Sequence, residues 1–347
     1  MRIRWILAAL LLSIACRGGW SQLAPSPDAA PVSHAPAAPE EDRSVATFKL
    51  QVNLVDVFFT VKDKNGNLVP HLNKTDCTPY EDKQPQTWKS FIAENNLPLT
   101  LGILLDTSGS QQNVLPLEQD AGAQFLDRVL KAKDEAFLLS FDVNVDLLQD
   151  FTNSPRLLAH AMSKAEINTA GGNGAAGIPG AGGGTVPTIG DPKGTLLYDA
   201  IYLASREKLN QESGRKAMII LTDGEDQGSR TKINEAVAAA QRSNALIYVI
   251  LIADTGFYGG WGYNGYSAAS RLAQETGGRV INVGNNGKKL QAAFAQIEDE
   301  LRTQYAGTYT PTNAKMDGTF RHLSLECRGD GLKVQTRKGY FAPAPEQ

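Results

Sequence analysis

The middle of the chain constrains the fold most, because apolar runs with strand character alternate there with amphipathic segments. Runs such as TLGILLD, KAMIILTD and ALIYVILIAD are apolar along nearly their whole length. Continuous apolar strands between helices are typical of a parallel sheet that is covered on both faces. We therefore predict a doubly wound, mainly parallel, Rossmann-like α/β domain over residues 97–303, with helices on both faces of its sheet.

The amphipathic segments predict where the helices of this domain lie. They are expected near residues 119–131, 154–164, 196–209, 232–243, 266–276 and 288–303. In sheets of this kind, ligands bind beyond the carboxyl ends of the strands. Polar residues that directly follow a strand are therefore the first candidates for a functional site.

The two flanks of this domain have a different pattern. Residues 47–96 and 304–347 contain short alternating segments separated by turn signals such as KNGN and Asp-Gly. Neither flank is long enough to form much of a core alone, so we predict that the two pair into one small β domain. That domain would contain both Cys77 and Cys327. A disulfide between them and two separate buried thiols are equal alternatives at this point.

The N-terminus predicts export. Two arginines precede a short apolar run, and small residues follow it, so residues 1–21 are interpreted as a secretory signal peptide. A lipoprotein signal with a lipid anchor at Cys16 and an uncleaved membrane anchor are the alternatives. Residues 22–46 are rich in Pro and Ala and are expected to form a disordered tether. We predict a protein of the periplasm, the extracellular space or the outer envelope.

Composition and missing motifs exclude several other functions. The 34 basic and 37 acidic side chains give a formal charge of −3, which removes the electrostatic case for nucleic-acid or anionic-membrane binding. The four histidines are scattered and Cys-x-x-Cys does not occur, so zinc sites of the finger type and thiol chemistry are unsupported. No glycine-rich nucleotide motif occurs either.

Three predicted loops carry oxygen-bearing side chains toward one edge of the sheet. Asp106, Ser108 and Ser110 form D-x-S-x-S after one strand, and Asp223 follows another. Thr195 lies at a predicted helix start between them. Carboxylates and hydroxyls are the hard ligands that Mg²⁺ and Mn²⁺ prefer, so the five residues predict a metal site. The alternative is that the aspartates cap turns and the serines cap a helix.

Other residues are expected around this site. Asp142 and Glu225 are candidates for an outer layer of residues that surround the metal ligands without binding the metal. For Asp142, a position on the surface is the simpler interpretation. The Gly-rich insertion 169–190 is expected to be a mobile loop near the site or disordered filler. A second loop carries aromatic residues that would contact a partner or fold over their own domain, namely Phe257, Tyr258, Trp261, Tyr263 and Tyr266.

The five ligand candidates, in this order and spacing, resemble the metal-ion-dependent adhesion site (MIDAS) of von Willebrand factor A (VWA) domains. The resemblance covers residues 97–303. The flanks, with VDVFFTVKDKNGNLV and KVQTRKGYFAP, resemble secreted bacterial VWFA-related proteins of the acidobacterial type.

This resemblance implies that the protein binds a partner through a metal ion and has no catalytic residues. A divalent cation, Mg²⁺ first and Mn²⁺ or Ca²⁺ as alternatives, would keep an open position that an Asp or Glu of a protein partner completes. Two competing functions are an envelope protein with a purely stabilising metal site and a metal-dependent hydrolase. The G-x-S-x-G motif of one hydrolase class is absent.

Overall fold

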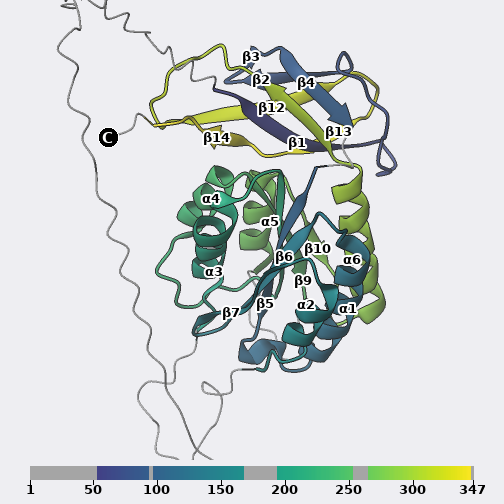
Figure 1. Cartoon of the computed structure of the whole chain (residues 1–347), viewed down its shortest axis with the longest axis vertical. Helices are drawn as coiled ribbons and strands as arrows, with labels where there is room; N and C mark the ends of the chain where they lie inside the picture. The colour runs from purple at the N-terminus through teal and green to yellow at the C-terminus, as the bar shows by residue number, and fades with distance from the viewer. Residues whose placement is uncertain (1–52, 94–96, 168–193, 253–264, 345–347) are drawn as a thin grey trace, which may run out of the picture. The chain divides into compact units, whose positions relative to one another are not determined.

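A mainly parallel six-stranded sheet forms the middle of the chain (Figure 1). The computed structural model describes residues 53–93, 97–167, 194–252 and 265–344. The strands of this sheet are, in spatial order, β10 (Val280–Asn282), β9 (Ala245–Leu251), β8 (Arg215–Thr222), β5 (Leu99–Asp106), β6 (Glu135–Phe141) and β7 (Val145–Thr152). All neighbours are parallel except β7, which pairs antiparallel with β6 at one edge. The predicted α/β fold is confirmed.

Helices cover both faces of this sheet and complete two apolar cores. They are α1 (Leu115–Val129), α2 (Pro155–Met162), α3 (Leu197–Leu203), α4 (Ile233–Arg242), α5 (Gly265–Thr276) and α6 (Gly287–Arg302). α1, α2 and α6 pack on one face and α3, α4 and α5 on the other (Figure 1). Strand β5 is buried along its whole length because its side chains enter both cores: Ile103 and Leu105 belong to one core, and Leu104 between them belongs to the other.

Helix α3 ends earlier than the sequence predicted. The amphipathic pattern continues to Leu209, but α3 stops at Leu203 and is followed by a π-helical turn, η3 (Ala204–Lys208), and a 3-10 turn, η4 (Leu209–Gln211). The Ser205 hydroxyl donates a 2.7 Å hydrogen bond to the Ile201 carbonyl oxygen. Such a bond competes with the regular helix ladder, which accounts for the change of helix type.

The strands of the two flanks interleave into two antiparallel sheets (Figure 1). One has the order β13 (Lys333–Thr336), β1 (Val55–Lys62), β11 (Tyr305–Tyr309) and β4 (Trp88–Ala93), and the other β14 (Gly339–Phe341), β12 (Phe320–Cys327), β2 (Cys77–Glu81) and β3 (Gln84–Pro85). Each sheet combines strands from both ends of the chain. The flanks and the α/β region fall in one compact unit, residues 51–347, so the predicted domain boundaries stay a prediction.

An aromatic core and a disulfide hold the flank strands together. Phe59 stacks on Tyr305 with 5.2 Å between the ring centroids, and Trp88 joins the same cluster. The Trp88 indole N–H also donates a 2.7 Å hydrogen bond to the Cys77 carbonyl oxygen. Cys77 and Cys327 lie opposite each other on β2 and β12 and form a disulfide. Of the two alternatives that the sequence left open, the structure has the bonded pair.

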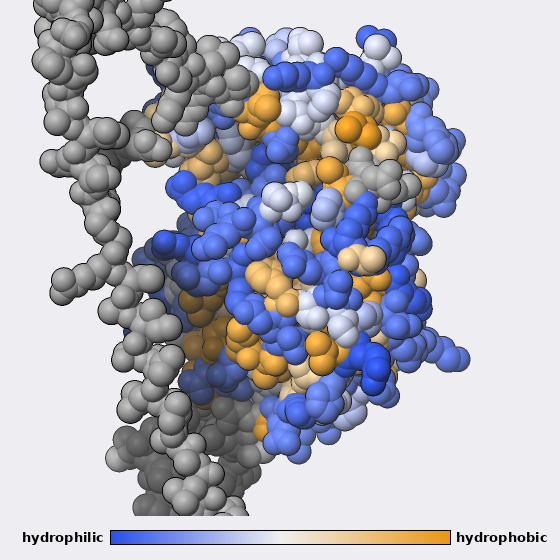
Figure 2. Space-filling model, viewed as in Figure 1, coloured by the Kyte–Doolittle hydropathy of each residue, from blue (hydrophilic) through white to orange (hydrophobic). Residues whose placement is uncertain are grey.

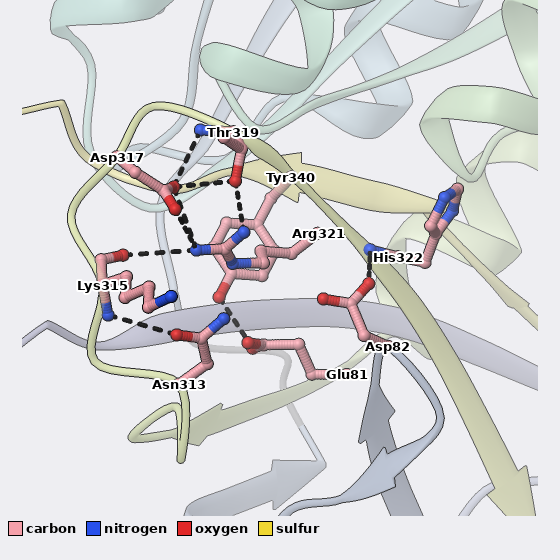
Figure 3. A network of polar contacts seen from close by, with 9 residues as sticks. All are labelled: Glu81, Asp82, Asn313, Lys315, Asp317, Thr319, Arg321, His322 and Tyr340. Carbon is pink, nitrogen blue, oxygen red and sulfur yellow. Dashed lines mark hydrogen bonds and ion pairs between the residues drawn. The ribbon is translucent and has the colours of Figure 1, made fainter.

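A polar network fixes the loop before β12 onto that strand (Figure 3). Asp317 accepts hydrogen bonds from the Thr319 hydroxyl (2.7 Å) and backbone N–H (3.1 Å), and one from Arg321 Nη2 (2.9 Å). These donors, the Thr319 hydroxyl first, lower the pKa of Asp317 to about 2. Figure 3 also shows the Tyr340 hydroxyl donating to Glu81, at 2.7 Å. Each acidic group of this network thus accepts at least one local hydrogen bond, and the network serves the structure of the sheet.

Glu300, near the end of α6, is buried among basic side chains. Its Oε1 lies 2.7 Å from Lys62 Nζ on β1 and 2.6 Å from Arg279 Nε. Gln335 on β13 approaches the other carboxylate oxygen at 3.5 Å. Two cations therefore compensate one buried carboxylate, and the cluster attaches the last helix of the α/β region to the sheet that contains β1.

Hydrophilic and hydrophobic residues are interspersed on the face seen in Figure 2. Large exposed apolar side chains occur on separate elements, with Leu147 on β7, Leu157 on α2 and Leu203 on α3. None of the helices in the described ranges is long and apolar enough to cross a bilayer. The predicted signal peptide, the tether, Cys16 and the Gly-rich insertion lie outside those ranges.

Candidate metal centre

Three strand ends meet at one edge of the central sheet, and two of them carry four of the five predicted ligands. β5 ends at Asp106, which pairs in register with Phe141, the last residue of β6. On its other side β5 pairs with β8, which ends at Thr222, directly before Asp223. Because these strands are parallel, the loops that follow them emerge at the same edge. The sequence therefore brings Asp106 and Asp223 to neighbouring positions.

Asp106 is fully buried and is held by two hydrogen-bond donors. Its Oδ1 accepts a 3.0 Å bond from the Ser108 backbone N–H, and its Oδ2 accepts a 2.6 Å bond from the Thr222 hydroxyl. Burial, and then the negative charge of Asp223, raise the pKa of Asp106 to about 7. The charged form of this carboxyl group is thus disfavoured in the protein alone, and a nearby cation would favour it.

The two serines connect the loop of Asp106 to Asp223. The hydroxyl oxygens of Ser108 and Ser110 lie 3.1 Å apart, and the Ser110 hydroxyl donates a 2.6 Å hydrogen bond to Asp223 Oδ2. The other oxygen of Asp223 accepts a bond from the Glu225 backbone N–H at 3.0 Å. Four of the five predicted ligands therefore form one hydrogen-bonded cluster.

Thr195 is linked to this cluster through its backbone. It exchanges two 2.9 Å hydrogen bonds with Gln227, in the loop after β8, and the N–H of the next residue, Leu196, donates to the Asp142 carbonyl oxygen at 2.8 Å. The Asp142 carboxylate in turn accepts a 2.8 Å bond from the Thr107 hydroxyl. Thr195 is thus anchored between the loops after β6 and β8, and its role as a ligand stays a prediction.

The two candidates for an outer layer have different environments. Asp142 is 8% exposed, so its interpretation as a surface carboxylate is wrong. It is buried because its carboxylate accepts hydrogen bonds from the Thr107 hydroxyl and from the Asn144 backbone N–H at 3.0 Å. Thr107 stands between two predicted ligands in the chain, so Asp142 supports their turn. Glu225 is half-buried and contacts Asp223 through its backbone.

One of the five aromatic residues that were predicted to contact a partner can be placed. Tyr266, the second residue of α5, is 54% exposed. Gly224 has a φ of +84°, and a Cβ atom at this position would meet the Gly265 carbonyl oxygen at 2.6 Å. The start of α5, with Tyr266, therefore lies close to the residue after Asp223. The other four aromatic residues of this prediction lie outside the described residues, namely Phe257, Tyr258, Trp261 and Tyr263.

Three buried residues at the cluster were not predicted from the sequence. Thr222 holds Asp106, as described above. Gln111 is fully buried with its Nε2 3.4 Å from the Ser110 hydroxyl oxygen, and its Oε1 has no hydrogen-bond partner in the described part of the chain. Glu118, in the first turn of α1, is also fully buried, and neither of its carboxyl oxygens has a partner there.

The donor set fits a hard divalent cation. Asp106, Asp223 and the two serines offer oxygen atoms only, as Mg²⁺, Mn²⁺ and Ca²⁺ prefer. Within the described ranges, no group of three His, Cys, Asp or Glu residues is arranged to hold a metal.

The capping alternative applies to only some of these residues. Ser108 stands at the N-cap position of η1 (Gly109–Gln111), but its side chain makes no capping bond, so this interpretation of Ser108 is wrong. Asp106 and Asp223 do accept turn hydrogen bonds, from Ser108 and Glu225. Turn capping and metal binding are therefore compatible roles for the two aspartates.

Comparison with known proteins finds similarity among solved structures. No family model matches the chain, and no curated protein matches it. BatB, a conserved hypothetical protein from Bacteroides thetaiotaomicron, aligns with a TM-score of 0.43 and 18% identity, over 59% of this chain and 99% of that chain. The vWF domain of the type V pili tip protein Mfa5 from Porphyromonas gingivalis aligns with a TM-score of 0.42 and 12% identity, over 59% and 95%.

A third similar structure is proximal thread matrix protein 1 from the mussel byssus, with a zinc-occupied MIDAS motif. It aligns with a TM-score of 0.45 and 15% identity. The alignment covers 62% of this chain and 48% of the mussel protein. Identities at this level concern the fold alone. Residues 99–302 have a mainly parallel α/β fold, with the D-x-S-x-S turn directly at the end of an interior strand, β5.

Proposed function

We propose that this chain is a secreted or envelope-associated module that binds a protein partner through a divalent cation. Asp106, Ser108, Ser110, Thr195 and Asp223 would hold the cation, and an Asp or Glu of the partner would complete its coordination. The observation that carries this proposal is the hydrogen-bonded oxygen cluster of Ser108, Ser110 and Asp223 beside a fully buried Asp106. Mg²⁺ is the preferred candidate, with Mn²⁺ and Ca²⁺ as alternatives.

The charges of the ligands favour an acidic partner. The two carboxylates among the five residues balance a divalent cation, and the three hydroxyls add no charge. A further carboxylate is attracted to such a cation more strongly than to one enclosed by carboxylates alone. Gly109 is exposed and Ser110 is half-buried, so the turn that carries the serines is accessible from solvent on this side.

The protein's own residues have separate tasks in this mechanism. A bound cation supplies the positive charge that the partner's carboxylate recognises. Asp106 has to be ionised to bind it, and Thr222 keeps its Oδ2 in place by the 2.6 Å hydrogen bond. Asp142 and Thr107 hold the turn between the ligands through their 2.8 Å hydrogen bond.

Export is part of the same proposal. It rests on the charged and apolar pattern of residues 1–21 and on the disulfide between Cys77 and Cys327. Disulfides form and persist in oxidising compartments, where partners of a secreted module are also found. Cell fractionation with thiol labelling tests it: the protein should be found outside the cytoplasm with both thiols blocked.

A selection experiment tests the binding function. A displayed library of random peptides is incubated with the immobilised protein in Mg²⁺ and eluted with EDTA. We expect the eluted peptides to share an Asp or Glu whose amide variant no longer binds, and we expect the Asp106→Ala protein to retain none of them. An Asp317→Ala protein, altered at an exposed acidic residue in the loop before β12, serves as the control and should select the same peptides.

Other outcomes would assign a different role to the site. Cation binding with no cation-dependent peptide would favour a stabilising metal. Turnover of an ester, peptide or phosphoester by the metal-loaded protein, lost in Asp106→Ala, would favour a hydrolase. Peptides that remain bound in EDTA, or that lack an acidic residue, would contradict the proposed mechanism of recognition.

A further inference from the structure

A buried acidic residue behind the predicted ligands is unexplained by the five-residue site. Glu118 is fully buried in the first turn of α1, and both of its carboxyl oxygens lack a hydrogen-bond partner among the described residues. Buried polar atoms in native proteins are nearly always hydrogen-bonded, and exceptions often mark the place of an ion or a water molecule. An acidic residue in the first turn of a helix is favoured by the helix dipole, but this effect does not account for a fully buried carboxyl group without a hydrogen-bond partner.

The charges that act on Glu118 are those of the proposed site. Burial raises the pKa of Glu118 well above its usual value, and the negative charges of Asp106 and Asp223 raise it further. The backbone connects Glu118 to the turn of the ligands: the Val114 N–H donates a 3.0 Å hydrogen bond to the Gln111 carbonyl oxygen, and the Glu118 N–H donates a 3.1 Å bond to the Val114 carbonyl oxygen. A cation between those ligands reverses the sign of the field and favours the ionised form of Glu118.

Gln111 provides a second, independent sign of a layer behind the ligands. Its side chain is fully buried, its Nε2 lies 3.4 Å from the hydroxyl oxygen of Ser110, and its Oε1 has no hydrogen-bond partner in the described ranges. Besides the predicted ligands there are thus two buried side chains whose oxygen atoms lack hydrogen-bond partners in the described ranges. One belongs to η1 and the other to α1.

We propose that Glu118 is a positioning residue of the cation site that sets the balance between cation and partner. Its negative charge strengthens the binding of the cation and weakens the attraction of the loaded site for the partner's carboxylate. Because no three acidic residues of the described chain are arranged to hold a metal directly, Glu118 acts from outside the coordination sphere, through water or Gln111. This inference rests on the proposed function.

The test uses Mn²⁺ as the cation and acetate as the probe carboxylate, with the wild type and Glu118→Gln. Water-proton relaxation reports both the binding of Mn²⁺ and the displacement of its water by acetate. We expect Glu118→Gln to bind Mn²⁺ about 10-fold more weakly, as is typical when an outer partner of a metal site is lost. At saturating Mn²⁺ we expect acetate to bind several-fold more tightly, because one repelling charge is gone.

Controls separate this role from a structural one. Glu135→Gln removes a half-buried acidic group at the opposite end of β6 and should change neither affinity. The thermal midpoint of cation-free Glu118→Gln should be no lower than that of the wild type. If Glu118→Gln has an unchanged affinity for Mn²⁺, or binds both Mn²⁺ and acetate more weakly, this inference is overturned while the proposed function stands. Failure of the wild type to bind Mn²⁺ would overturn the proposed function as well.

Discussion

Two buried glutamates in this chain have opposite electrostatic environments. Glu300, at the end of α6, lies 2.7 Å from Lys62 and 2.6 Å from Arg279. The carboxyl oxygens of Glu118, at the start of α1, have no hydrogen-bond partner in the described ranges, and burial, followed by the charges of Asp106 and Asp223, disfavours the ionised form. Burying an ionised carboxylate costs several kcal/mol unless it is compensated. At Glu300 the protein supplies the compensation itself.

The comparison distinguishes a structural acidic cluster from one that is arranged for a ligand. The cations at Glu300 come from β1 and from the segment before β10, so they join parts of the fold. At the carboxyl edge of the sheet, Asp106 and Glu118 are buried with raised pKa values, and hydroxyl groups surround the acidic ligands. This edge gains compensation when a cation binds, which is the physical basis of the proposed function.

The largest predicted effect is a loss of stability when the ion-pair cluster of Glu300 is disrupted. Glu300→Ala leaves Lys62 and Arg279 without their carboxylate and should lower the free energy of unfolding by about 3 kcal/mol, because removing one partner of a buried ion pair is strongly destabilising. Urea denaturation measures it. Glu298→Ala, on the same helix with more exposed partners, is the control and should lose less than about 1 kcal/mol. Equal losses would remove the distinction between the two glutamates.

The next prediction concerns the removal of one of the two acidic ligands at the uncompensated cluster. Asp106→Asn should weaken Mg²⁺ binding at least about 100-fold, beyond the loss typical of outer partners of a metal site. The cation-free variant should be no less stable than the wild type, because it loses a carboxylate that burial and Asp223 disfavour. Calorimetric titration and thermal unfolding measure the two quantities. A variant that keeps its affinity would show that Asp106 is no ligand.

A pH series sharpens the comparison without any substitution. The pKa of Asp106 is raised from 3.8 to about 7 in the folded protein, so the folded state binds more protons than the unfolded state between these values. Stability of the cation-free protein should therefore fall as pH rises through this range, by at most about 1.4 kcal/mol per pH unit for one proton. Saturating Mg²⁺ should flatten this slope, because the cation lowers the folded pKa. An identical slope with and without Mg²⁺ would contradict the account.

The smallest effect concerns a neutral ligand. Ser110→Ala removes one hydroxyl from the coordination sphere and its hydrogen bond to Asp223, so Mg²⁺ affinity should fall about 10-fold while both carboxylates remain. Ser205→Ala, which removes a buried hydroxyl from η3, should leave the affinity unchanged. If Ser110→Ala binds as tightly as the wild type, Ser110 serves only to orient Asp223.

The fold could be predicted because its signals are local. Apolar strands and amphipathic helices are written in runs of adjacent residues, and five of the six helices begin and end within four residues of their expected bounds. Asp106 and Asp223 could be placed at one edge because each directly follows an apolar strand. The early end of α3 was missed because the periodicity does not show the hydrogen bond of Ser205.

The rest of the site depends on contacts between residues far apart in the sequence. The burial of Asp142 follows from a bond to Thr107, 35 residues away, which a single acidic residue after a strand does not indicate. The pairing of Cys77 with Cys327 spans 250 residues. Glu118 had a readable signal: it shares the buried face of α1 with Leu115 and Phe125, so an acidic residue interrupts an apolar stripe.

The most direct test of the central claim is anomalous scattering from crystals of the protein grown with Mn²⁺. We predict one strong peak within coordination distance of Asp106, Ser108, Ser110 and Asp223, which disappears in Asp106→Asn crystals grown in the same way. A saturated Mn²⁺ crystal with no peak at this edge would contradict the account, and the hydrogen-bonded oxygen cluster would then be a feature of the turns alone.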